Sequence, residues 1–336
     1  MKRFRLKRFV IFTRHVAIVL TGLVVLSPYL AIVKGQQQAT TTTLRPGIVI
    51  DPTANIAYAM TPEGVTAIDL ASGAKRWTSN AAAQPLTIAV NQLLSQVEPK
   101  TRTNRLELAL LDTRAQGAVT VRRVTELPSF VRVSIGQTLE GKFETEARLL
   151  ANRAIVNWRF ENQPLRGIVE EPESDKIDVV GPQSQNVGRA VEGALQVDMT
   201  TGAVSPADAN LAPRAPARRW LLTASEKISS AAPTQYESAD GRHVMASERI
   251  SDDKTWAKYR WTVFERSTNK RLGEFRTHLA FAPFVVRDST LVYETTPYIR
   301  GGNQEPAKLR GVNLAAGQEA WSVEVRELEY RGPFPP

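Results

Sequence analysis

The sequence predicts an all-β protein, and two observations lead to this prediction. Short segments rich in β-branched and aromatic residues alternate with turns that contain Gly, Pro and Asp, whereas amphipathic helix patterns are scarce. A turn motif with Asp, Gly and Trp at fixed offsets also recurs at intervals of roughly 40–50 residues. Many short strands connected in this way are typical of packed sheets rather than of helix bundles.

The N-terminus is read as a targeting segment. Residues 1–15 carry six basic side chains and no acidic one, and residues 16–33 form an uncharged, mostly apolar run. This pattern is typical of export signals, but the run also approaches the roughly 20 residues that cross a bilayer as a helix. We therefore expect residues 1–35 to be a helical signal peptide or signal anchor, followed by a polar linker at 36–46. The body is expected to be periplasmic, or anchored to the membrane outside the cytoplasm.

The targeting segment also explains the basic character of the chain. Residues 1–35 contain seven of the 43 Lys and Arg residues and none of the 34 acidic ones, so the remainder has 36 basic and 34 acidic residues. The body is therefore nearly neutral, and its bulk charge gives no reason to expect nucleic-acid binding.

The turn motif is clearest in the segment 58–77, YAMTPEGVTAIDLASGAKRW. Two predicted strands flank the turn Thr61–Gly64, where Pro and Gly suit the backbone angles of a tight turn. In the next turn the carboxylate of Asp69 can accept backbone N–H bonds, and Gly73 can adopt a left-handed conformation. Trp77 then supplies a large ring to bury between neighbouring units.

Later segments repeat this pattern with decreasing fidelity. The last copy keeps the offsets, with Asn in place of Asp, and three partial copies lie between. The repeat residues are Asp69, Gly73 and Trp77; Asp112 and Gly117; Asp198 and Gly202; Glu265 and Asn269; and Asn313, Gly317 and Trp321. Asn also tolerates a left-handed turn, so Asn269 preserves the geometry of Gly.

The spacing of the copies predicts a β-propeller at residues 47–331. Strand–turn–strand units at this period are typical of propeller blades, and the length allows five or six four-stranded blades. The interval of 86 residues from Asp112 to Asp198 is twice the 43 from Asp69 to Asp112. We therefore expect a degraded unit in the longer interval, at Phe130–Ile135 and Lys142–Arg148.

The motif resembles the tryptophan-docking repeat of pyrroloquinoline-quinone (PQQ) dehydrogenases and PQQ-like propellers, among them the propeller lipoprotein of the bacterial outer-membrane barrel-assembly machine. This resemblance implies that the repeat residues are structural. In the enzymes the quinone lies between a Trp and a vicinal disulfide, near Ca²⁺. This chain has no Cys and about half the length of those enzymes, so it resembles a non-catalytic branch. Neither PQQ nor Ca²⁺ is expected.

The residues themselves offer little for catalysis. Without Cys there is no thiol nucleophile or thiolate metal site, and the three His residues (15, 243 and 278) lack metal-ligand spacing. No Ser lies in a Gly-x-Ser-x-Gly motif. A Ser-His-Asp triad is not excluded by counting, and a carboxylate pair at Asp252 and Asp253 remains a further alternative. Whether the protein is an enzyme is left open, with the balance against it.

Segments that do not fit a compact blade are predicted to be surface features. Residues 161–193 and 203–217 have the composition of loops, and the Pro-rich tail at 332–336 favours an extended conformation. Residues 250–261 combine aromatic and charged side chains, which suits either a single-strand nucleic-acid platform or packing between blades, and we expect packing.

These observations predict a non-catalytic, exported β-propeller that acts as a protein-binding scaffold in the bacterial envelope. The alternative is a propeller that binds a small ligand or a PQQ-type cofactor, with a role related to oxidoreductases. Spectral titration with PQQ and Ca²⁺ distinguishes the two.

Overall fold

The structure is a computed structural model that describes residues 41–51, 53–138, 141–162, 190–208, 210, 219–223, 225–228, 234–251, 257–300 and 303–327. Several predicted features lie outside these ranges: the signal segment 1–35, most of the linker, most of the loop 161–193, much of the loop 203–217, Asp252, Asp253 and the Pro-rich tail. Where the chain is described, it contains no helix that is long and apolar enough to cross a membrane.

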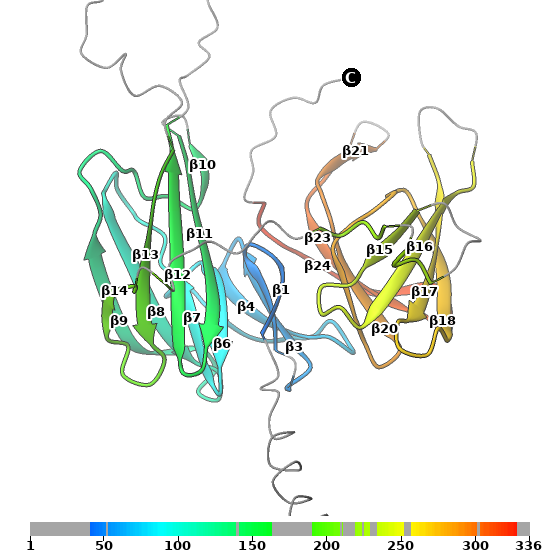
Figure 1. The fold of residues 1–336 in the computed structure, drawn as a ribbon, viewed down its shortest axis with the longest axis horizontal. Coiled ribbons are helices and arrows are strands. Elements are labelled where there is room, and N and C mark those ends of the chain that lie inside the picture. The colour runs from blue at the N-terminus through cyan, green and yellow to red at the C-terminus, as the bar shows by residue number, and fades with distance from the viewer. Residues whose placement is uncertain are drawn as a thin grey trace, which may run out of the picture. The chain divides into compact units, whose positions relative to one another are not determined.

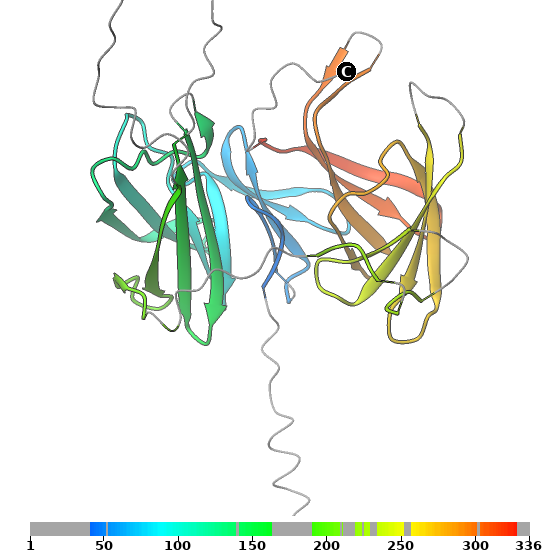
Figure 2. The same cartoon turned by 45° about the horizontal axis from the view of Figure 1, so that its top comes forward.

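The described residues form an all-β structure with five antiparallel sheets of four or five strands (Figures 1 and 2). We number the sheets 1–5 in chain order. Sheet 1 contains β1 (Thr42–Arg45), β2 (Ile48–Asp51), β3 (Ile56–Thr61), β4 (Gly64–Asp69) and β5 (Lys75–Ser79). Sheet 2 contains β6 (Gln84–Ala89), β7 (Gln92–Gln96), β8 (Arg105–Asp112) and β9 (Ala118–Glu126). Sheet 3 contains β10 (Gly136–Thr138), β11 (Gly141–Leu150), β12 (Arg153–Glu161), β13 (Ala190–Asp198) and β14 (Val204–Pro206).

The last two sheets follow the same plan. Sheet 4 contains β15 (Thr234–Glu237), β16 (His243–Arg249), β17 (Tyr259–Glu265) and β18 (Arg271–Thr277). Sheet 5 contains β19 (Phe284–Arg287), β20 (Thr290–Thr295), β23 (Lys308–Asn313) and β24 (Gln318–Glu324). A separate hairpin of β21 (Tyr298–Arg300) and β22 (Asn303–Glu305) interrupts sheet 5. Each of the five sheets is otherwise an antiparallel meander, in which consecutive strands are hydrogen-bonded neighbours.

Four apolar clusters join the sheets in the order 3, 2, 1, 5 and 4. Because side chains alternate between the two faces of a strand, β3 contributes to two clusters. Tyr58 faces sheet 2, whereas Ala57 and Ala59 face sheet 5. Among the described residues, none of these clusters joins sheets 3 and 4.

The last sheet in the sequence therefore lies against the first. The backbone N–H of Arg326 donates to the carbonyl of Met60 at 2.8 Å, and the side chains of Arg45 and Glu294 form an ion pair between the two sheets. Contacts between segments so distant in the sequence come from tertiary packing rather than from any local turn.

Residues 86–95 form the hairpin β6–β7 rather than one continuous strand, because Val90 has a φ of 55° and reverses the chain. Phe130–Ile135 forms no strand, and no degraded unit separates sheets 2 and 3. The long interval is instead occupied by sheet 3, whose strands β11 and β12 have 10 and 9 residues. Between residues 219 and 225, the described part of the chain forms no named strand, and Leu221 makes an isolated bridge with Tyr236.

Strands also occur where the sequence predicts irregular chain. β1 lies within the predicted linker at 36–46 and pairs with β2, and β14 lies within the predicted loop 203–217. In the segment 250–261, Trp261 is fully buried and contacts Phe275 and Tyr293 edge-on. The predicted packing role is confirmed for this Trp.

Candidate functional site

Each of the five sheets carries one copy of the repeat turn, between its last two strands. In four of the turns the side-chain oxygen of the first residue accepts backbone N–H bonds from the residues two and three positions later. The acceptors are Asp69, Asp112, Asp198 and Asn313, at distances of 2.8 to 3.3 Å. These carbonyl and carboxylate oxygens hold the turns rigid.

The glycines of the repeat have left-handed backbone angles, as the turn requires. Gly73, Gly117, Gly202 and Gly317 have φ between 67° and 77°. Asn269 replaces Gly in sheet 4 and has a φ of 58°, so this substitution does preserve the turn.

The repeat residues also join neighbouring sheets. A Cβ atom added to Gly117 of sheet 2 would lie 2.5 Å from the ring of Trp77 in sheet 1, and one added to Gly73 of sheet 1 would lie 2.5 Å from the ring of Trp321 in sheet 5. Val121 holds the offset of the missing Trp in sheet 2, and it lies against Gly202 of sheet 3. The predicted repeat residues thus lie in turns and sheet contacts rather than together in one site.

The repeat deviates most in sheet 4. Glu265 replaces Asp, and its carboxylate accepts a hydrogen bond from the hydroxyl of Thr268 instead of from two backbone amides. Gly273 stands where the first and last copies have Trp, and the backbone of Leu314 in sheet 5 lies directly against it. Arg266, the residue directly after Glu265, is charged. In the first copy of the repeat the corresponding residue is Leu70, which follows Asp69 and is fully buried. This deviation leaves room for polar groups between sheets 4 and 5.

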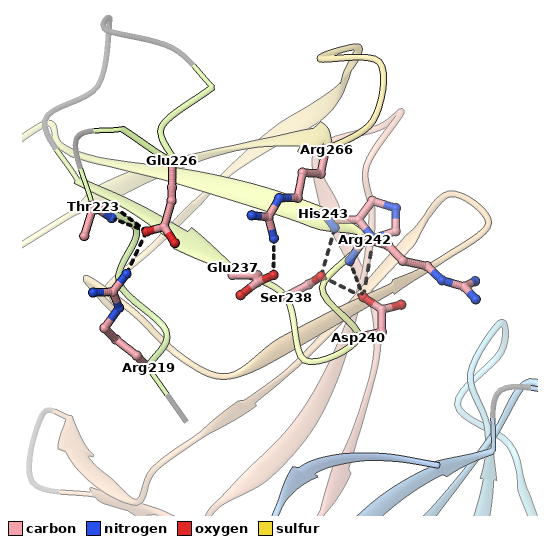
Figure 3. A network of polar contacts seen from close by, with 9 residues as sticks. All are labelled: Arg219, Thr223, Glu226, Glu237, Ser238, Asp240, Arg242, His243 and Arg266. Carbon is pink, nitrogen blue, oxygen red and sulfur yellow. Dashed lines mark hydrogen bonds and ion pairs between the residues drawn. The ribbon is translucent and has the colours of Figure 1, made fainter. Parts of the chain in front are cut away.

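A polar cluster centred on Asp240 occupies this region, in the turn between β15 and β16 (Figure 3). Its carboxylate accepts hydrogen bonds from the Ser238 hydroxyl at 2.7 Å and from the Arg242 backbone N–H at 3.2 Å, and it forms an ion pair with Arg287 at 2.6 Å. The backbone N–H of His243 donates to the Ser238 hydroxyl at 2.9 Å. Side chains from sheets 4 and 5 therefore meet at one carboxylate.

These residues include a Ser, a His and an Asp, but their geometry does not form a catalytic triad. In a triad the His ring accepts the hydroxyl proton of Ser. Here Ser238 is fully buried and its hydroxyl donates to Asp240. The Nδ1 atom of His243 lies 3.8 Å from the Asp240 carboxylate, which is too long for a hydrogen bond. The arrangement locks the turn and does not activate a nucleophile.

The protonation of Asp240 supports the same conclusion. Burial alone raises the pKa of this carboxyl, but the nearby His243, the Ser238 hydroxyl, the Arg287 guanidinium and the Arg242 N–H outweigh burial and hold the pKa well below its usual range. A general base that works near neutral pH needs a pKa near the operating pH. Asp240 stays ionised, and its negative charge is used to hold Arg287.

Two further ion pairs extend the polar network along sheet 4 (Figure 3). Arg266 pairs with Glu237, and Arg219 contacts Glu226 at 2.7 Å. The Thr223 hydroxyl is the main cause that lowers the pKa of Glu226, which also accepts the Thr223 backbone N–H. A cavity of about 570 Å³ opens beside the Asp240 cluster, lined by charges of both signs, including Arg242, Arg266, Glu265 and Asp288.

Among the described residues, no three His, Cys, Asp or Glu side chains lie together as a potential metal site, and the whole sequence has no Cys. The rings of Trp77 and Trp321 lie against glycines of the neighbouring sheets, so in this structure these rings pack between sheets. Of the other candidate groups, the His278 ring lies 3.3 Å from the carbonyl of Ala257.

Several large hydrophobic residues on sheet 2 are exposed, which the sequence pattern did not predict. Seven large hydrophobic residues of the described chain are exposed, and four of them belong to sheet 2 or the loop that follows it. These are Val90, Val119, Val124 and Phe130, with exposed fractions of 83%, 36%, 55% and 52%. Strand periodicity did not distinguish these valines from core residues, because it does not show which strand ends a sheet.

Comparisons with known proteins do not assign the chain to a family. No protein-family model and no curated protein matches it. Among solved structures, it is similar to a mutant of the apocarotenoid oxygenase of Synechocystis, with 8% sequence identity and a TM-score of 0.24. The match covers 84% of this chain and 59% of that structure, so the chain spans less than two thirds of its length. At this TM-score the similarity carries no argument about fold or function.

Proposed function

We propose that this protein is a non-catalytic, exported β-propeller of five blades that binds another protein as a scaffold in the bacterial envelope. Five sheets that share one turn architecture, with the last sheet packed against the first, support the propeller. The proposal further requires sheets 3 and 4 to be neighbours. The basic and apolar N-terminal sequence supports export. The repeat turns are held by side-chain hydrogen bonds and contact neighbouring sheets, and such a rigid framework supports a scaffold role.

The exposed hydrophobic residues on sheet 2 carry the proposal of protein binding. Of the seven exposed large hydrophobic residues in the described chain, four belong to this sheet or the loop after it, and exposed hydrophobic residues that gather on one part of a surface are typical of interaction sites. Val90 adds a second cost, because a β-branched residue is strained in the left-handed conformation that it adopts. A cationic side chain accompanies these residues: Arg123 has no acidic partner among the described residues. Apolar contacts with adjacent positive charge suit a partner protein with an acidic surface.

Site-specific photo-crosslinking in the native envelope tests this function. A photoreactive side chain at Val124 of the full-length protein is expected to capture one specific partner, with a yield that saturates as the protein is expressed more strongly. Ile250, which is also exposed but lies at the end of sheet 4, is the matched control position. If neither position captures a specific protein, the scaffold function is wrong. Protease protection of the body in intact cells, lost when the outer membrane is opened, tests export separately.

A further inference from the structure

The outer edge of β9 is suited to receive a strand from another protein. We infer that β9 is an acceptor for strand addition, and that it binds an extended, acidic segment of the partner. This inference rests on the proposed function and specifies the surface and the kind of partner. Strand addition supplies affinity through backbone hydrogen bonds and specificity through alternate side chains.

β9 is the last strand of sheet 2, so only one of its edges is paired. Its inner edge bonds to β8 from Ala118 to Glu126, and no described strand pairs with its outer edge. With nine residues it is the longest of the strands that end the five sheets in this way; β5, β14, β18 and β24 have five, three, seven and seven. A long unpaired edge offers a row of free N–H and C=O groups to an incoming strand.

The side chains of β9 favour pairing as well. Five of its nine residues are β-branched, and seven of the nine are exposed. β-branched residues suit a strand with neighbours on both sides. Sheets protect such edges with a proline, a covering segment, a bulge, charged side chains or a short strand. β9 has a bulge where it pairs with Leu110 and Leu111 and carries three charged side chains, but it has no proline and is nine residues long.

The charges on β9 select an acidic partner. Arg122 forms an ion pair with Glu107 of β8 at 2.9 Å, and Glu126 with Arg105 at 3.0 Å. Among the described residues, the adjacent Arg123 has no acidic partner, and its guanidinium donates to the carbonyl of Arg122 at 3.0 Å. This uncompensated charge lies on the strand itself, beside the positions that an added strand would occupy. Opposite charges on paired strands attract and like charges repel.

Sheet 2 holds this edge in place before any partner arrives. The Asp112 carboxylate orders the turn that leads into β9, and the carbonyl of Asn91 accepts the backbone N–H of Thr113 at 2.9 Å. On one face, Val121 packs against Gly202 of sheet 3, and on the other the Arg122 side chain donates to the carbonyl of Ala81 at 3.0 Å. A rigid acceptor loses little conformational entropy on binding.

Binding of synthetic peptides to the full-length protein tests the inference. The probe is a fluorescent peptide of alternating Glu and Val, followed by fluorescence anisotropy. The comparison peptides alternate Lys and Val, or carry an N-methyl group on every residue of the acidic peptide, which leaves neither edge able to donate backbone hydrogen bonds. We expect the acidic peptide to bind most tightly, and N-methylation to weaken binding about tenfold or more, because it removes several backbone hydrogen bonds. Equal binding of the N-methylated peptide would overturn strand addition, and equal binding of the Lys peptide would overturn the acidic preference.

Variants locate the binding on β9. Arg123→Glu is expected to weaken the acidic peptide by about fivefold or more, since attraction becomes repulsion. Arg114→Glu is the matched control: it reverses another exposed Arg, in the turn before β9, and should change affinity less than about twofold. Hydrogen exchange of the β9 amides should slow on peptide binding. If exchange slows elsewhere but not in β9, or if β9 is already protected by self-association of the free protein, the inference is wrong.

The crosslinking experiment separates this inference from the proposed function. If the Arg123→Glu protein still captures its partner through Val124 with unchanged yield, β9 strand addition is wrong but the scaffold function stands. If no partner is captured in the envelope while the peptide binds to β9 as expected, the edge is an acceptor and the proposed function is wrong.

Discussion

The indole ring of Trp321, near the end of the described chain, lies against Gly73 in the first sheet and donates its Nε1–H to the carbonyl of Leu70 at 3.2 Å. One side chain thus joins sheets 5 and 1, although the residues are separated by about 250 positions in the sequence. The contact requires Gly at position 73 for two reasons, a left-handed φ of 72° and the absence of a Cβ atom. The following predictions separate these reasons and test neighbouring features.

Replacing Gly73 by Ala is expected to destabilise the protein more than the same change at Gly241. Both glycines have a φ of 72°, so both variants bear the left-handed penalty of about 1–2 kcal/mol. Only at Gly73 does the new Cβ meet a buried ring, whereas at Gly241 the nearest atom belongs to the flexible Glu237 side chain at 3.1 Å. We expect an additional cost of about 1–3 kcal/mol at Gly73, measured by urea unfolding followed by circular dichroism. Equal losses in the two variants would show that Trp321 does not pack on this glycine.

Truncating Trp321 itself should remove the contact between sheets 5 and 1. Trp321 is 8% exposed, so Trp321→Ala is expected to lower the free energy of unfolding by about 3–5 kcal/mol. Trp321→Phe keeps an apolar ring but loses the hydrogen bond to Leu70, and should cost about 1–2 kcal/mol. Trp77→Ala should cost less than Trp321→Ala, because the Trp77 ring is only partly buried. An unchanged unfolding midpoint for Trp321→Ala would contradict the packing role.

The Asp240 cluster makes a pH-dependent contribution to stability. The pKa of this carboxyl is depressed in the folded protein, so its stabilising effect is complete above the unfolded value of about 3.9 and is lost as the pH falls toward the folded pKa. Asp240→Asn leaves Arg287 without its ion-pair partner and should cost about 3 kcal/mol at neutral pH. The stability difference between wild type and variant should stay constant above about pH 5 and narrow below about pH 4. A difference that is absent at pH 7, or one that does not change on acidification, would contradict this assignment.

The parts of the fold that were predictable from the sequence depend on local chemistry. Asp69 and Gly73 form a turn through groups within five residues of each other, so their spacing alone predicts the geometry. The same reasoning correctly places Asn269 in a left-handed conformation. The all-β class follows from many such turns between short strands, because each turn limits the length of the strand before it.

The parts that were missed depend on contacts between distant segments. The hairpin β6–β7 reverses at Val90, a residue type that local rules do not place in a left-handed turn. Half of the residues of β1 are threonines, whose polar sequence context predicted a linker, and the segment becomes a strand because β2 is present to pair with it. The Asp240 cluster draws Arg287 from another sheet, so sequence spacing could not reveal it. Likewise, the exposed edge of β9 is defined by which strand ends the sheet, which is a tertiary property.

The strain at Val90 predicts a stabilising substitution. Asn tolerates the left-handed conformation better than a β-branched residue, so Val90→Asn is expected to raise the free energy of unfolding by about 1 kcal/mol. The Val90 side chain is 83% exposed, so replacing it loses little buried apolar surface and little hydrophobic stabilisation. The measurement is the urea midpoint of the full-length protein relative to wild type.

Val124→Asn is the matched control for this prediction. Val124 is also exposed, but it lies within β9 and has no left-handed backbone angle, so Asn there relieves no strain and is expected to give no gain. A loss of stability in Val90→Asn would mean that the valine side chain supports the hairpin. If Val90→Asn gains stability while its capture of the envelope partner falls, the strain at this position is retained for binding rather than for folding, as expected of a residue under selection for an interaction.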